Sequence, residues 1–246
     1  MRSLSGCLLV ATVALVWMAS TAVGQTTVPM SFNGYYSAVS CAGPEGCVGA
    51  GLYGGTVNGV SVGPNNQVAG MVCDDYFDNI TPGETWKANG VSAGSLTASN
   101  IGSLTLFGTK MGSAAIQDYT EIAYLISQMF FGNPTQGQQA AISEAIWYIS
   151  SGGVSNSGAL SSTEQGYLTA AVGAWANGQG INLGQYAGLY IYTPTPQAPG
   201  EAQEMWSTVP VPEGGTALGY LLLAGLCCFG AMFLRSRRQS GSISAA

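Results

Sequence analysis

Short β-prone stretches fill the first half of the chain, from Val28 to about Thr109. Each combines apolar or aromatic residues with polar ones and is bounded by Gly, Asn or Pro, which is typical of short strands separated by turns. The expected strands cover residues 32–40, 57–63, 67–77, 84–94 and 103–110. A further strand is expected at 188–194, in the stretch GLYIYTP.

Between these strand regions the hydrophobic period changes to that of a helix. In 118–131, Ile122, Leu125, Ile126 and Met129 recur on one helical face, and Gly132-Asn133-Pro134 ends the pattern. The same argument predicts a helix over 135–150, with Gly152-Gly153 as its end. A third is predicted over 162–177, where Ser161 and Glu164 have the spacing of a capping box.

Strands followed by helices and a returning strand predict an α+β protein. We expect a β-sandwich or barrel-like domain over 25–193, with a helical hairpin or three-helix insert. The apolar helical stripes are assigned to its core. The Pro- and Gly-rich segment 194–210 is expected to be a linker.

The N-terminus has the pattern of a secretory signal peptide. Arg2 precedes an apolar run from Leu8 to Ala19, and the small residues Ala22 and Gly24 follow. We therefore expect residues 1–24 to be removed by signal peptidase after export through the Sec translocon, leaving no retained membrane helix there.

The C-terminus has the pattern of a single membrane span. The uncharged run from Ala217 to Leu234 would be about 27 Å long as a helix, close to the thickness of a bilayer core. Arg235, Arg237 and Arg238 follow it and would stay on the cytoplasmic side with the tail 239–246. Pro212-Glu213, followed by two glycines, is expected to form an extended segment just outside the membrane.

This order of Pro-Glu, apolar span and arginine cluster over 211–238 resembles the PEP-CTERM sorting signal of bacterial proteins, although Gly214 replaces the second proline of that motif. The resemblance implies recognition by an exosortase and cleavage near Pro212-Glu213. The protein would pass through an inner-membrane intermediate and end at the cell surface or in the extracellular matrix. A plain membrane anchor is the alternative.

Charge and composition exclude several function classes. Lys87 and Lys110 are the only basic residues of the exported body, whereas all of the chain's 12 acids except Glu213 lie there, so nucleic-acid binding is not expected. The chain has no histidine, which removes Ser-His-Asp and Cys-His catalysis and imidazole metal sites. We expect no enzymatic activity, no cofactor and no metal site. The acids Asp74, Asp75 and Asp78 are assigned to solvated turns rather than to a cation site.

Three cysteines remain in the exported body. Cys41 and Cys47 flank a turn and are expected to form a disulfide in an oxidising compartment, which leaves Cys73 as a buried or a functional thiol.

The stretch from Met71 to Trp86, with the later AISEAIWYI, is similar to the thioester domains of bacterial surface adhesins. That resemblance implies a β-sandwich with helices and a reactive thioester between Cys73 and a helical glutamine. The glutamine position is Ser143 here, which has no amide to exchange, and Gln139 lies one turn earlier.

The sequence therefore predicts an exported surface or matrix protein sorted by an exosortase, with a structural or adhesive role in the envelope or biofilm. Exopolysaccharide or another matrix polymer is its expected partner. A thioester adhesin using Cys73 and a passively anchored ectodomain are the alternatives.

Overall fold

The computed structural model describes residues 26–43, 46–63, 70–154, 156, 158–176, 182–196, 202–211 and 225–226. Apart from 225–226, these residues belong to one compact unit, Gln25–Val211. The predicted signal peptide 1–24, the span 217–234 and the tail 239–246 lie outside the described residues, except for 225–226 within the span. Within the described ranges, no helix combines the length and apolarity needed to cross a bilayer.

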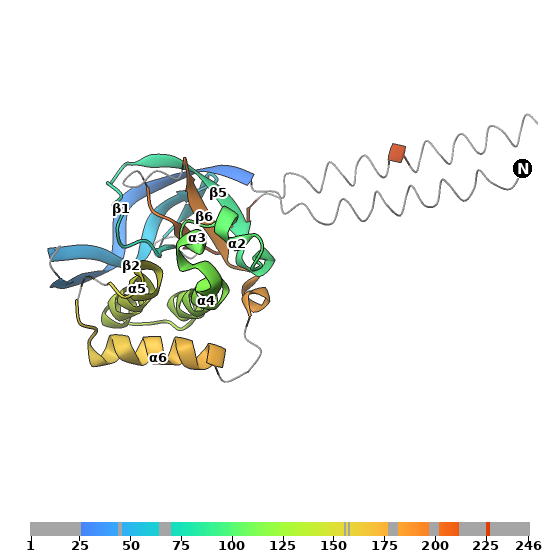
Figure 1. The fold of residues 1–246 in the computed structure, drawn as a ribbon. Helices are drawn as coiled ribbons and strands as arrows, with labels where there is room; N and C mark the ends of the chain where they lie inside the picture. The colour runs from blue at the N-terminus through green and yellow to red at the C-terminus, as the bar shows by residue number, and fades with distance from the viewer. Residues whose placement is uncertain are drawn as a thin grey trace, which may run out of the picture. The chain divides into compact units, whose positions relative to one another are not determined.

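Antiparallel strands form one sheet in this unit (Figure 1). The described residues contain β1 (Thr26–Gly43), β2 (Gly46–Val57), β3 (Val60–Val62), β4 (Met71–Cys73), β5 (Thr85–Ser92), β6 (Tyr190–Thr195) and β7 (Met205–Ser207). Their order in the sheet is β1-β5-β6-β7-β4-β2-β3, and β1 also pairs with β2. The strand pairing therefore closes into a ring, with β3 attached beside β2.

Three long helices lie together next to the sheet (Figure 1). They are α4 (Ala115–Phe131), α5 (Gln136–Ser151) and α6 (Ser162–Ala176). Helix α5 packs against β1 and β2, and α6 packs against both α4 and α5. Four short helices, all within described segments, connect the sheet to this layer: η1 (Ala93–Ser95), α2 (Ile101–Leu104), α3 (Gly108–Met111) and η2 (Gly112–Ala114). One more short helix, η3 (Leu183–Tyr186), precedes β6.

The predicted helices end close to where the structure ends them, because local signals set the boundaries. Thr135 caps α5 by accepting a hydrogen bond from the Gln138 backbone N–H, and the Gln138 side chain accepts from the Thr135 N–H in return. Gly152 terminates the helix in the left-handed conformation, with φ of 76°. The prediction of an α+β protein is confirmed at this level.

Two predicted segments are wrong. Residues 103–110, expected as a strand, contribute to the short helices α2 and α3, because the turn at Asn100 starts helical hydrogen bonds such as Leu104 N–H to the Asn100 carbonyl. The expected linker 194–210 contains β7, which pairs with both β4 and β6. Its three residues are too few to show a strand period, yet Met205 and Trp206 are fully buried.

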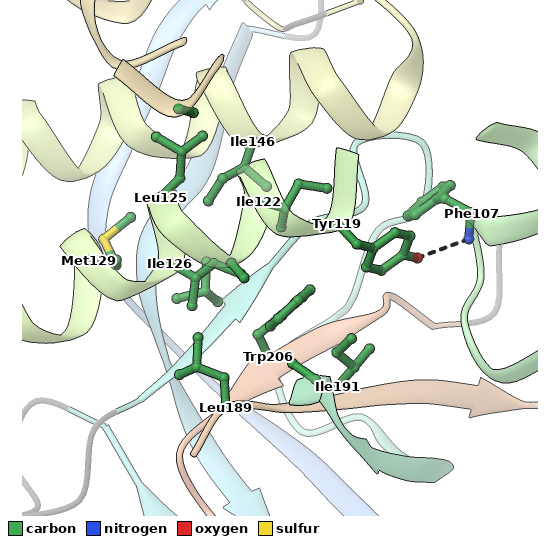
Figure 2. Packing of buried hydrophobic residues seen from close by; sticks show 14 of the residues in the cluster. Phe107, Tyr119, Ile122, Leu125, Ile126, Met129, Ile146, Leu189, Ile191 and Trp206 are labelled. Carbon is green, nitrogen blue, oxygen red and sulfur yellow. Dashed lines mark hydrogen bonds between the residues drawn. The ribbon is translucent and has the colours of Figure 1, made fainter. Parts of the chain in front are cut away.

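The core has two parts. One fills the ring of strands and includes Val28, Met30 and Phe32, which alternate along β1 with more exposed residues. The other lies between the sheet and the helices, where Trp206 of β7 lies beside Tyr119, Ile122 and Ile126 of α4 (Figure 2). Helix α4 is therefore held by the apolar face that its sequence period predicts.

Candidate functional site

A cleft of about 530 Å³ opens beside the β1–β2 pair. Its walls come from five separate parts of the chain: β1, β2, the segment after β4, helix α5 and the residue Gln203 just before β7. The lining residues are Phe32, Tyr36, Cys47, Val48, Gly49, Tyr53, Asp75, Tyr76, Phe77, Asn79, Ile80, Pro82, Trp147 and Gln203.

Six of the 14 residues that line this cleft are aromatic. Tyr36 and Phe77 leave 42% and 53% of their surface exposed, so their rings are available to a ligand. Tyr76 packs against Phe77 and against Trp147, with ring centroids 5.7 Å and 5.9 Å apart. These contacts hold the rings of Tyr76, Phe77 and Trp147 in place before a ligand binds, which lowers the entropic cost of binding.

A turn after β4 supplies the polar groups of the cleft. The Asp75 Oδ1 atom accepts hydrogen bonds from the backbone N–H groups of Phe77 at 3.0 Å and Asp78 at 3.3 Å. Gln203 Nε2 donates to the Asp75 carbonyl at 3.1 Å and to the Asp78 carbonyl. Gln203 therefore ties the β7 side of the fold to this turn.

Asp75 Oδ2 and Gln203 Oε1 are buried oxygen atoms that accept no hydrogen bond from an N–H or O–H donor among the described residues, and the two residues are 1% and 7% exposed. The Asp75 carboxyl also has a side-chain hydrogen bond with the Asp78 carboxyl. Burial, and secondarily the neighbouring Asp78 carboxylate, raise the pKa of Asp75 to about 7. Asp75 therefore keeps its proton to a higher pH than an exposed aspartate does.

A second pair of carboxyl groups, Asp74 and Glu204, lies inside the core and does not line the cleft. Glu204 accepts hydrogen bonds from Tyr119 Oη at 2.6 Å, Thr193 Oγ1 at 2.5 Å and the Leu106 N–H at 2.7 Å. Burial raises the pKa of both acids, and the nearby Glu204 raises that of Asp74 further. A proton shared between them removes the cost of two adjacent buried charges.

Asp74 and Asp75 therefore differ from the solvated turn expected from sequence, whereas Asp78 is only partly buried. The two buried acids directly follow β4, which places Asp74 in the core and Asp75 next to the cleft. Among the described residues, no group of three or more His, Cys, Asp or Glu side chains could hold a metal ion.

Cys73 is a buried thiol on β4. Its Sγ donates to the Asp75 carbonyl at 3.0 Å and accepts from the Asp75 N–H at 3.2 Å. Burial, followed by the charges of Asp75 and Asp74, raises the pKa of this thiol well above its usual range, which makes the thiolate scarce at neutral pH.

The residues of the thioester-like helix have other partners. Trp147 Nε1 donates to the Cys73 carbonyl at 3.2 Å, so the motif's tryptophan does approach the cysteine. Ser143 Oγ accepts from the Gly51 N–H at 2.9 Å, and Gln139 Oε1 accepts from Ser37 Oγ. Both side chains are engaged by β1 and β2 rather than by β4.

The structure contains a disulfide between Cys41 and Cys47, which joins the ends of β1 and β2. Cys47 lines the cleft, so the crosslink braces one of its walls. The sorting residues Pro212, Glu213, Arg235, Arg237 and Arg238 lie outside the described residues.

Sequence reasoning missed the cleft because its walls are distant in the chain. Gln203 lay in the segment assigned to a linker, and Tyr36 was counted only as part of a strand. The pair of adjacent aromatics at Tyr76-Phe77, directly after three acidic or thiol residues, was the one local signal available.

A scan against protein-family models, a search of curated proteins and a search of solved structures each returned no match to this chain.

Proposed function

We propose that the protein is an exported surface or matrix protein whose body binds a carbohydrate polymer in the aromatic cleft. The observation that carries this proposal is the combination of exposed rings at Tyr36 and Phe77 with buried oxygens at Asp75 and Gln203 that receive no hydrogen bond from an N–H or O–H donor among the described residues. Aromatic faces pack against the C–H faces of sugar rings, and carboxylate and amide oxygens accept hydrogen bonds from hydroxyl groups. The role is adhesive or structural and requires no catalysis.

The sorting half of the proposal rests on the C-terminal sequence. An exosortase would recognise Pro212-Glu213 outside the membrane while the span 217–234 and the arginines hold the chain in place. Cleavage there would release the body to the cell surface or to the exopolysaccharide matrix.

The binding half is tested with the full-length precursor and the secreted body on a panel of soluble and insoluble polysaccharides. Tyr36→Ala and Phe77→Ala should each weaken binding roughly three- to tenfold, the loss expected for one ring contact. Tyr35→Ala is the matched control, because Tyr35 is an adjacent, 38% exposed tyrosine that does not line the cleft. Equal losses in all three variants, or no binding to any polymer, would contradict the proposal.

The sorting half is tested by cell fractionation in a host that contains an exosortase. The wild-type body should appear outside the cell without its C-terminal segment, and the double variant Pro212→Ala, Glu213→Ala should stay in the inner membrane at full length. A wild-type protein that also keeps its C-terminal segment would instead indicate a passively anchored ectodomain.

A further inference from the structure

We propose that the cleft prefers a sugar unit with a free, protonated amino group over the same unit bearing an N-acetyl or a hydroxyl group. This inference rests on the proposed carbohydrate function and names its substrate class: a polymer containing de-N-acetylated hexosamine.

The first argument is the type of the atoms that lack a donor. In the described lining of the cleft, the two buried side-chain atoms that receive no hydrogen bond from an N–H or O–H donor are Asp75 Oδ2 and Gln203 Oε1, and both are oxygens. A ligand that completes this site must bring donors. An ammonium group has three N–H donors and no acceptor, whereas a hydroxyl or an N-acetyl group also brings acceptor oxygens.

The second argument is that these acceptors are held in place. Gln203 Nε2 already donates to the carbonyls of Asp75 and Asp78, so the amide cannot turn its nitrogen toward the ligand without losing both bonds. Asp75 Oδ1 is occupied by two backbone N–H groups, and the rest of that carboxyl interacts with the carboxyl of Asp78, so two acids lie together beside Gln203. The oxygens of Asp75 and Gln203 are therefore held in positions that favour a ligand group that donates hydrogen bonds.

The third argument is charge. No lysine or arginine is among the lining residues, while Asp75 lines the cleft and Asp78 interacts with it. Aromatic faces add to this negative field because they attract cations. One ammonium already uses them: Lys110 Nζ lies 4.8 Å from the centroid of the Phe77 ring. A bound amine would also favour the ionised form of Asp75, whose pKa burial and Asp78 raise to about 7.

The test compares three β-1,4-linked oligosaccharides of equal length that differ in the substituent at one carbon: glucosamine, N-acetylglucosamine and glucose oligomers. Isothermal titration calorimetry of the secreted body at near-neutral pH and low salt measures each affinity. The glucosamine oligomer should bind about tenfold more tightly than the other two, and added salt should reduce the difference.

Two variants give opposite expected effects. Asp75→Asn should remove the preference for the amine, because it deletes the charge at constant size. Lys110→Gln should strengthen binding of the glucosamine oligomer alone, because it removes a like charge from the Phe77 ring. Lys87→Gln is the control, since Lys87 is also an exposed lysine but lies on β5, and it does not line the cleft. Lys110→Gln keeps the test decisive even if Asp75→Asn fails to fold.

Equal affinity for the three oligomers, or a preference for the N-acetyl or glucose form, would overturn the inference and leave carbohydrate binding intact. Binding to other polysaccharides but to none of the three would also overturn it. Failure of the polysaccharide panel described above would instead overturn the proposed function itself.

Discussion

The indole Nε1 of Trp206 donates a hydrogen bond to the Oδ2 atom of Asp74 at 2.7 Å, with both residues fully buried. The bond joins β7 to the segment that follows β4. Strands β4 and β7 are themselves paired in the sheet. The Trp206 ring also stacks on Tyr119 of α4, with centroids 6.0 Å apart (Figure 2). One side chain therefore connects the sheet, the buried acid Asp74 and helix α4.

Trp206→Phe should lower the free energy of unfolding by about 2–4 kcal/mol, because it leaves a cavity and removes the donor to a buried carboxyl oxygen. The measurement is urea denaturation followed by circular dichroism. Trp86→Phe provides the control: Trp86 is half-buried and its buried Nε1 has no hydrogen-bond partner, so no bond is lost. Comparable destabilisation by the two variants would show that the Trp206–Asp74 bond contributes little.

The stability of the body should decrease as the pH rises from about 4 to about 7. The folded state raises the pKa of Asp75 from 3.8 to about 7, so in this interval the folded protein holds a proton that the unfolded chain releases. Stability from this group is complete below the unfolded pKa and is lost as the pH rises through the folded pKa, by up to about 1.4 kcal/mol per pH unit.

Urea titrations at several pH values test this, with Asp75→Asn beside the wild type. The variant should show a shallower slope in this interval, while Asp74 and Glu204, whose pKa values burial also raises, maintain a remaining slope of the same sign. An unchanged slope in Asp75→Asn would exclude this carboxyl as the source.

Cys73 should resist alkylation by iodoacetamide in the folded body and react fully once the protein is unfolded in urea. Its thiol is buried and its raised pKa disfavours the reactive thiolate. Intact-mass measurement of the same sample tests the thioester alternative, since an internal thioester lowers the mass by one ammonia and adds methylamine. The mass expected here is that of a free thiol, and a methylamine adduct would restore the thioester hypothesis.

Loss of the Cys41–Cys47 disulfide should lower the free energy of unfolding by about 2 kcal/mol, the value expected for constraining such a short loop in the unfolded chain. The double variant Cys41→Ser, Cys47→Ser, compared with wild type under non-reducing conditions, measures this. Adding a reductant to the folded double variant controls for effects on Cys73. The free energy of unfolding of this variant should not change. Because Cys47 lines the cleft, ligand affinity should fall in the same variant.

Local patterns predicted the three long helices with ends within a few residues. The capping box of Ser161 and Glu164, the stop at Gly152 and the break before Pro134 act over a single turn, so they can be identified from the chain alone. The same local rules were wrong for 103–110 and for 194–210. In 103–110 the turn at Asn100 starts the helical hydrogen bonds, and Glu204, which is distant in the chain, accepts from the Leu106 N–H. In 194–210 distant partners decide the structure, because β7 is inserted between β4 and β6.

The amino-acid sequence by itself determined the α+β class, the principal helices and the pairing of Cys41 with Cys47, because each depends on residues that are near neighbours along the chain. Only the tertiary structure decided the cleft. Tyr36, Asp75, Trp147 and Gln203 meet there because the closed ring of strands brings β1, the end of β4, α5 and the start of β7 together. Whether a buried oxygen has a hydrogen-bond partner depends on which distant segments the fold brings together. No local hydrophobic period or residue spacing encodes this.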